Sequence, residues 1–99
     1  MNDTWVIIPS FNEGKRLEHT LKELSEYNVI VVNDGSTDGT ENISVKHLLT
    51  HKINLGQGAA LQTGFDYVKR FKPKYVITMD ADGNGSHPPQ TLRSELSPR

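Results

Sequence analysis

Two aspartates at the end of an apolar run, Asp80 and Asp82, are the residues whose type and spacing most directly suggest chemistry. They follow the run Tyr75–Met79, and a glycine-rich stretch comes after them. Adjacent carboxylates repel each other unless a cation lies between them. Asp-x-Asp at a strand end points both side chains to the same side, because strand residues alternate faces. The pattern favours one hard cation, Mg²⁺ or Mn²⁺, shared with the phosphates of a substrate.

Two other interpretations of this segment stay open. In the first, Asp80 only caps a turn. In the second, the segment is an EF-hand calcium loop, whose matching residues are Asp80, Asp82, Asn84 and Gly85. Thr91, however, stands where such a loop has its bidentate glutamate, and a strand is expected where a helix should precede the loop. The calcium loop is therefore the weaker interpretation.

Polar clusters follow two other apolar runs as well. Pro9–Glu13 comes after the run Trp5–Ile8, and Asn33–Thr40 comes after the run Val29–Val32. Open parallel α/β sheets bind ligands at the carboxyl ends of their strands, where the loops meet. We therefore expect the three polar clusters to lie around one site.

Each cluster also has a structural explanation when it is taken alone. Asn12 or Glu13 could cap the helix that follows. Asp34 and Asp38 could form Asx turns within their loop. The expectation that all three clusters share one sheet edge favours a binding site over these separate explanations.

The apolar runs predict the strands of a parallel sheet. They are β-branched and uninterrupted by polar residues, which is typical of strands covered on both faces by helices. Leu17, Leu21 and Leu24 recur at helical spacing. Strands are expected at 5–8, 29–32, 45–49 and 75–79, helices at 15–26 and 56–70, and helix-forming residues beyond Pro89. The predicted fold is a three-layer α/β domain with a mostly parallel sheet, and residues 1–99 form a single domain.

The composition excludes several classes of protein. With 99 residues and a net charge of −1, the chain has no basic footprint for nucleic acid, so no nucleic-acid partner is expected. The absence of cysteine fits a reducing cytoplasm. The longest apolar runs are too short to cross a bilayer. No pair of histidines has the close helical spacing of zinc ligands, so we expect no metal site at His19, His47, His51 or His87.

The segment Asn54–Ala60 opens the second predicted helix with two glycines. Glycine allows close approach of a ligand to the backbone near the positive end of a helix. The spacing differs from the dinucleotide-binding pattern G-x-G-x-x-G, because Leu61 occupies the third glycine position. The P-loop pattern is absent as well. Dinucleotide and P-loop sites are therefore disfavoured.

Four blocks of the sequence, in this order, resemble the GT-A fold family 2 glycosyltransferases. The resemblance is closest to the dolichyl-phosphate (polyprenyl-phosphate) mannose and glucose synthases. The blocks are Pro9–Glu13, Asn33–Thr40, Asn54–Ala60 and Asp80–Gly83. The resemblance implies transfer of a sugar, with inversion at the anomeric carbon, from a nucleotide-diphosphate donor to a lipid phosphate or similar acceptor.

The same resemblance implies roles for single residues. It places Phe11, where the family commonly has tyrosine, near the nucleoside, and Asp34, with Val32 below it, at the base or ribose. It places Asp80 and Asp82 at the diphosphate and at the metal, Mg²⁺ or Mn²⁺. The full set implied at the nucleotide sugar is Pro9, Phe11, Glu13, Val32, Asp34, Asp80, Ala81 and Asp82.

The sequence also departs from the family pattern. The connection after Thr40 is short, and Ser86–Pro89 matches the family only loosely. The family's acceptor-binding half would begin where this sequence ends, so no catalytic base is assigned. Two hypotheses follow: an active transferase, cytoplasmic or peripheral to a membrane and assembled as a homo-oligomer, or a truncated, non-catalytic fragment that only binds the nucleotide sugar.

Overall fold

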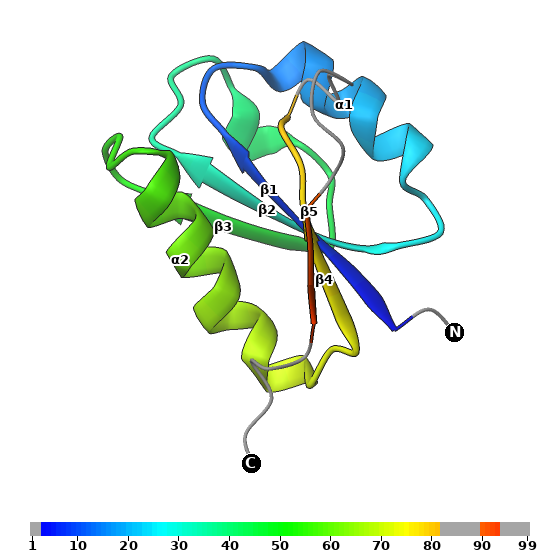
Figure 1. Cartoon of the computed structure of the whole chain (residues 1–99). Helices are drawn as coiled ribbons and strands as arrows, with labels where there is room; N and C mark the ends of the chain where they lie inside the picture. The colour runs from blue at the N-terminus through cyan, green and yellow to red at the C-terminus, as the bar shows by residue number, and fades with distance from the viewer. Residues whose placement is uncertain (1–2, 82–89, 94–99) are drawn as a thin grey trace.

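The computed structural model describes residues 3–81 and 90–93, and it shows helices on both faces of one sheet (Figure 1). The strands are β1 (Thr4–Ser10), β2 (Asn28–Asp34), β3 (His47–His51), β4 (Tyr75–Thr78) and β5 (Gln90–Arg93). The α-helices are α1 (Gly14–Glu23) and α2 (Gln57–Val68), and the short 3₁₀ helices are η1 (Thr40–Asn42) and η2 (Lys69–Phe71). The predicted α/β class with a mostly parallel sheet is confirmed.

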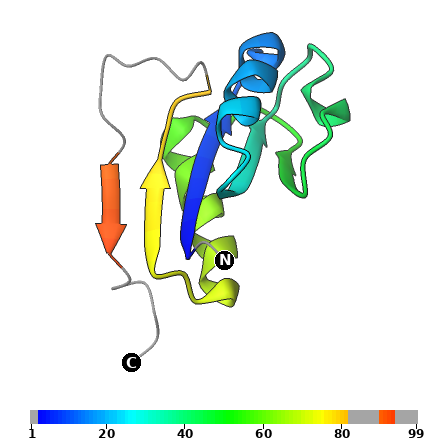
Figure 2. The ribbon, with the colours of Figure 1, turned by 90° about the vertical axis from the view of Figure 1, so that its right-hand side faces the viewer.

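The sheet has the strand order β3-β2-β1-β4-β5. β1 pairs in parallel with β2 on one side and with β4 on the other, and β3 continues the parallel pairing beyond β2. β5 pairs antiparallel with β4 at the edge (Figure 2). Since β2, β1 and β4 are parallel neighbours, their carboxyl ends lie at one edge of the sheet. The expectation that these three strand ends lie together is confirmed.

The two α-helices cover opposite faces of the sheet, and β1 contributes to both cores. Val6 and Ile8 pack on one face with Leu17 of α1. Trp5 and Ile7 pack on the other face, in the same cluster as the buried residues of α2. Covering both faces explains why the strands are apolar without interruption.

The first helix, the third strand and the segment beyond Pro89 differ from the sequence-based expectations. The first helix ends at Glu23 and not at residue 26. The third strand was expected at 45–49 but occupies His47–His51, because its register follows its pairing with β2. Val45 instead packs beside the α1-side core. Beyond Pro89 the helix-forming residues begin a strand, β5, because pairing along β4 satisfies the backbone groups of an otherwise open edge.

An aromatic cluster holds α2 and η2 against the amino ends of β1 and β3. Trp5 stacks on Phe71 with ring centroids 4.4 Å apart. His47 lies edge-on to Phe71 at 5.1 Å, and its Nδ1 is 2.8 Å from the Tyr67 hydroxyl. Burial, with a smaller effect from the charge of Lys46, lowers the pKa of His47 below 6.5. The folded chain therefore favours the neutral imidazole.

This cluster gives a pH-dependent stability that we expect to measure. Because the pKa of His47 is lower in the folded chain, the unfolded chain binds more protons as the pH falls below 6.5, and stability is lost over that range. His47→Gln removes the titration but keeps a partner for the Tyr67 hydroxyl. Urea midpoints at about pH 7 and pH 5 should therefore differ less in His47→Gln than in the parent. The exposed His19, as His19→Gln, is the control, and equal pH dependence in all three proteins would contradict the prediction.

Candidate functional site

The loops after β1 and β2 are joined by hydrogen bonds through Asn12. Its backbone N–H donates to Ser36 Oγ at 2.9 Å, and its side-chain Oδ1 accepts the Thr37 N–H at 2.8 Å. Asn12 has a φ of 54°, in the left-handed region that asparagine tolerates better than most residues. Two of the three predicted polar clusters therefore form one connected surface.

Asp38, in the loop after β2, caps α1, the helix that follows the loop after β1. Its Oδ2 accepts the Gly14 N–H at 3.1 Å, and its Oδ1 accepts the Thr40 hydroxyl and N–H. The Thr40 hydroxyl, followed by the Gly14 N–H, lowers the pKa of Asp38 below its ordinary value. Glu13 is the N-cap residue but makes no side-chain cap bond, and Asn12 is engaged with Thr37. The interpretation that Asn12 or Glu13 caps α1 is wrong, because the cap comes from a distant loop.

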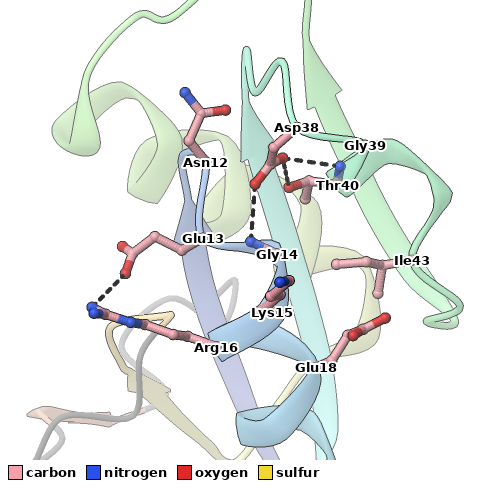
Figure 3. Close-up of a pocket in the computed structure, with 10 residues that line it drawn as sticks. All are labelled: Asn12, Glu13, Gly14, Lys15, Arg16, Glu18, Asp38, Gly39, Thr40 and Ile43. Carbon is pink, nitrogen blue, oxygen red and sulfur yellow. Dashed lines mark hydrogen bonds and ion pairs between the residues drawn. The ribbon is translucent and has the colours of Figure 1, made fainter.

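A cavity of about 610 Å³ lies between these two loops and the start of α1 (Figure 3). Glu13 points toward Arg16 at its rim, with their charged atoms 3.6 Å apart. Of the predicted site residues that the structure describes, Glu13 alone lines this cavity. The lining residues are Asn12, Glu13, Gly14, Lys15, Arg16, Glu18, Asp38, Gly39, Thr40 and Ile43.

Asp34, at the end of β2, is buried and heavily hydrogen-bonded. Its side chain is 4% exposed. Its Oδ1 lies 2.7 Å from His51 Nδ1 and accepts the Leu55 N–H at 2.9 Å. Its Oδ2 accepts the Asn54 side-chain N–H at 3.0 Å and the Gly56 N–H at 2.9 Å. The carboxylate therefore ties the end of β2 to the segment that leads into α2.

The environment of Asp34 stabilises its charged form. Burial is the largest influence and would raise the pKa of Asp34, but the hydrogen bonds from Leu55, His51 and Gly56 together lower it below 3.8. Both carboxylate oxygens are occupied within the chain. The assignment of Asp34 to the base or ribose of a nucleoside stays a prediction, and these bonds give Asp34 a further role in shaping the loop beside it.

Gly35 lets the segment after β3 cross closely over the end of β2. Its φ is 77°, and a Cβ placed there would lie 2.4 Å from Asn54 N and from the Ile53 carbonyl carbon. Asn33 makes the turn that follows, since its Oδ1 accepts the Ser36 N–H at 3.0 Å. The turn that was the alternative role predicted for Asp34 is therefore formed by its neighbour Asn33.

The end of β4 is fixed to α1. The Thr20 hydroxyl donates to the Ala81 carbonyl at 2.9 Å, and Ala81 is buried. Asp80 is exposed, and its carboxylate has no hydrogen bond or ion pair with the described residues. Among the described residues, the buried Ser10 Oγ at the end of the neighbouring strand β1 also has no hydrogen-bond partner. Asp82, as well as Asn84 and Gly85 of the alternative calcium loop, lies outside the described residues.

The remaining predicted site residues differ in how far a ligand could reach them. Phe11 is 46% exposed in the loop after β1. Pro9 is half-buried at the end of the same strand. Val32 is completely buried in the core beside α2, so it acts on the site only by supporting the end of β2.

Sequence reasoning missed His51, Asn54 and Thr63 as partners around Asp34. His51 Nε2 lies 2.8 Å from the Thr63 hydroxyl, which links this group to α2. One signal was present in the sequence, namely the polar residue His51 close to the expected third strand. It was missed because that strand was expected two residues too early.

Residues 3–81 and 90–93 contain neither a metal cluster nor a membrane-spanning helix. No group of three or more His, Cys, Asp or Glu side chains there could hold a metal ion. Neither α-helix in this part of the chain is long and apolar enough to cross a membrane. Asp82 and His87 lie outside these residues.

Comparison with known proteins gives one matching family. The model described as glycosyl transferase family 2 matches residues 5–96. No solved structure gave a significant match.

Several curated relatives have similar sequences. An uncharacterized protein of Methanocaldococcus jannaschii is 39% identical, over 98% of this chain and 42% of the relative. A dolichyl-phosphate beta-glucosyltransferase of Trichomonas vaginalis is 31% identical, over 79% of this chain and 30% of the relative. A polyprenol monophosphomannose synthase of Mycolicibacterium smegmatis is 33% identical, over 90% of this chain and 38% of the relative. The chain spans less than half the length of these relatives.

Proposed function

Because this chain belongs to glycosyltransferase family 2, we propose that it binds a nucleotide-diphosphate sugar at the carboxyl ends of β1, β2 and β4 and serves its transfer to a polyprenyl phosphate. The observation that carries this proposal is the parallel order β2-β1-β4, which sets the carboxyl ends of these three strands side by side. Relatives named for dolichyl-phosphate and polyprenol substrates support this class of acceptor. Such an acceptor would bring the site to a membrane surface.

The described residues suit a donor of this kind. Phe11 offers an exposed aromatic face to a nucleoside, and Glu13 is a carboxylate at the rim of the neighbouring cavity. The Asn12 bonds hold these two residues in one loop conformation. Preorganised loops lower the entropy cost of binding. The proposed donor therefore meets a surface that is already arranged.

The residues present also fit a divalent cation. Asp80 is exposed at the end of β4 and has no partner among residues 3–81 and 90–93, so its carboxylate is available as a hard oxygen ligand. We propose that Asp80 and Asp82 hold Mg²⁺ or Mn²⁺. When bound, such an ion neutralises charge on the diphosphate oxygens of the leaving group. Inversion at the anomeric carbon is part of the same proposal.

Metal and nucleotide should bind to this site cooperatively. Each is expected to strengthen the other by the same factor, about 5-fold to 150-fold, because binding free energies are reciprocal. Asp80→Asn and Asp82→Asn should each remove most of this coupling, since each deletes one negative charge and leaves the shape nearly unchanged. The measurement is calorimetry of GDP and UDP at several Mn²⁺ concentrations. Asp66→Asn, an exposed carboxylate on α2, is the matched control.

Nucleotide affinity that does not depend on Mn²⁺ in the parent would show that Asp80 and Asp82 do not serve a metal. The second hypothesis, a fragment that binds the donor without transfer, needs another assay. Sugar transfer to a polyprenyl phosphate in detergent, with and without Mn²⁺, separates the two. Coupled binding without transfer would favour the donor-binding fragment.

A further inference from the structure

His51 is held at both ring nitrogens. Its Nδ1 lies 2.7 Å from Asp34 Oδ1, and its Nε2 lies 2.8 Å from the Thr63 hydroxyl. Its side chain is 12% exposed. The ring therefore joins the ends of β2 and β3 to α2.

The chemistry of the three groups fixes the orientation of the ring. An ionised carboxylate only accepts hydrogen bonds, so His51 Nδ1 must carry the proton that it donates to Asp34. In the neutral ring, Nε2 is then an acceptor, and the Thr63 hydroxyl can donate to it. A carboxylate held by a ring that is itself anchored has little freedom to rotate.

The orientation of the Asp34 carboxylate in turn determines the position of the segment 52–56. His51 shares Oδ1 with the Leu55 N–H, and Oδ2 receives the Asn54 side chain and the Gly56 N–H. Asn54 thus points inward, whereas its neighbours Ile53 and Leu55 are 66% and 55% exposed. The segment, held in one backbone conformation, therefore exposes the large apolar side chains of Ile53 and Leu55 at the edge of the site.

We propose that His51 is a positioning residue for donor binding, which acts through Asp34 to hold the segment 52–56 in the conformation that receives the nucleotide. This inference rests on the proposed function and deepens it. His51 itself need not touch the donor. The residue on α2 that completes the arrangement is Thr63.

The first test uses two substitutions that keep different parts of the ring's chemistry. Asn places its side-chain N–H where His51 has Nδ1, so His51→Asn can still donate to Asp34, whereas His51→Leu fills similar space without a donor. GDP and UDP affinities are measured by calorimetry with Mn²⁺ at a temperature where every variant is folded. His51→Leu should weaken binding about tenfold and His51→Asn by less than about threefold, as loss of a bond to a charged group predicts. His19→Leu, on the exposed side of α1, is the control.

The second test needs no ligand. Amide hydrogen exchange of Leu55 and Gly56 should be accelerated about tenfold or more in His51→Leu, because the loop opens locally when its anchor is lost. Amides in the middle of α1 should exchange at the parent rate. This measurement reports on the loop even if the nucleotides bind poorly.

The outcomes separate this proposal from the proposed function. A parent that binds neither GDP nor UDP would overturn the proposed function and the link of His51 to a donor, and the exchange rates would still decide whether His51 holds the loop. A parent that binds, with His51→Leu binding equally well, would overturn the positioning role alone. Equal losses in His51→Asn and His51→Leu would show that the ring acts by packing and not through Asp34. Unchanged exchange of Leu55 and Gly56 would also contradict the proposal.

Discussion

Gly35→Ala is expected to destabilise the chain by about 2–5 kcal/mol and to displace the loop that crosses β2. Two effects add. The left-handed φ of 77° is unfavourable for any residue with a Cβ, and the added methyl would lie 2.4 Å from the backbone of Asn54 and Ile53. The contacted atoms belong to the backbone, so turning a side chain cannot relieve the contact. The hydrogen bonds from the Leu55 and Gly56 N–H groups to Asp34 hold the following residues of the same segment in place.

Gly39 provides a control for the conformational part of this effect. Its φ is 87°, but a Cβ there would meet nothing within 4 Å. Gly39→Ala should therefore cost only the left-handed strain, about 1–2 kcal/mol. Urea unfolding of the parent and both variants gives the difference between them. Equal losses in Gly35→Ala and Gly39→Ala would mean that the loop does not press against Gly35 in solution.

Asp34→Asn is expected to destabilise the folded chain by about 3–5 kcal/mol, the usual cost of removing one member of a buried charged network. Each carboxylate oxygen of Asp34 receives two hydrogen bonds, so the new NH₂ group must face donors at one of the two positions. The measurement is the free energy of unfolding in urea near neutral pH. Asp66→Asn should behave as an ordinary surface substitution, because Asp66 is exposed on α2.

The same substitution should change the response to acid. The pKa of Asp34 is lower in the folded chain than its ordinary 3.8, so the unfolded chain binds the proton more readily. The stability from the charged carboxylate is complete above the unfolded value and is lost as the pH falls through the lower, folded value. Below about pH 4 the parent should therefore lose stability more steeply than Asp34→Asn. Parallel acid curves would show that Asp34 is not the charged acceptor that the geometry indicates.

The sheet could be predicted from the sequence because its strands are determined by local composition. Val29–Val32 has apolar side chains for both faces and lies within β2 as expected. The third strand was misplaced, because Val45 suits a strand locally whereas the pairing with β2 begins at His47. Pairing register and edge coverage depend on partners far along the chain, which a local pattern does not record.

The shared edge of the three strand ends was predictable from the sequence, and the bonds between their loops were less so. The parallel order brings Phe11 and Asp80 to the shared edge, as the polar clusters indicated. The cap that Asp38 gives to Gly14, and the bond between Asp34 and His51, join residues from different loops. Such bonds form only once the loops are folded against each other, so no short sequence motif predicts them.

The central place of β1 also bears on the order in which the chain can fold. Trp5 pairs with Asn28 on one side and with Val76 on the other, so one neighbour of β1 is close in sequence and the other is distant. Closing a long loop costs more entropy than closing a short one. During synthesis, β1, β2 and β3 can therefore associate before β4, which pairs with the other side of β1, has been made. We therefore expect the loops around Asp34 to take shape first and Asp80 to reach them only when β4 docks.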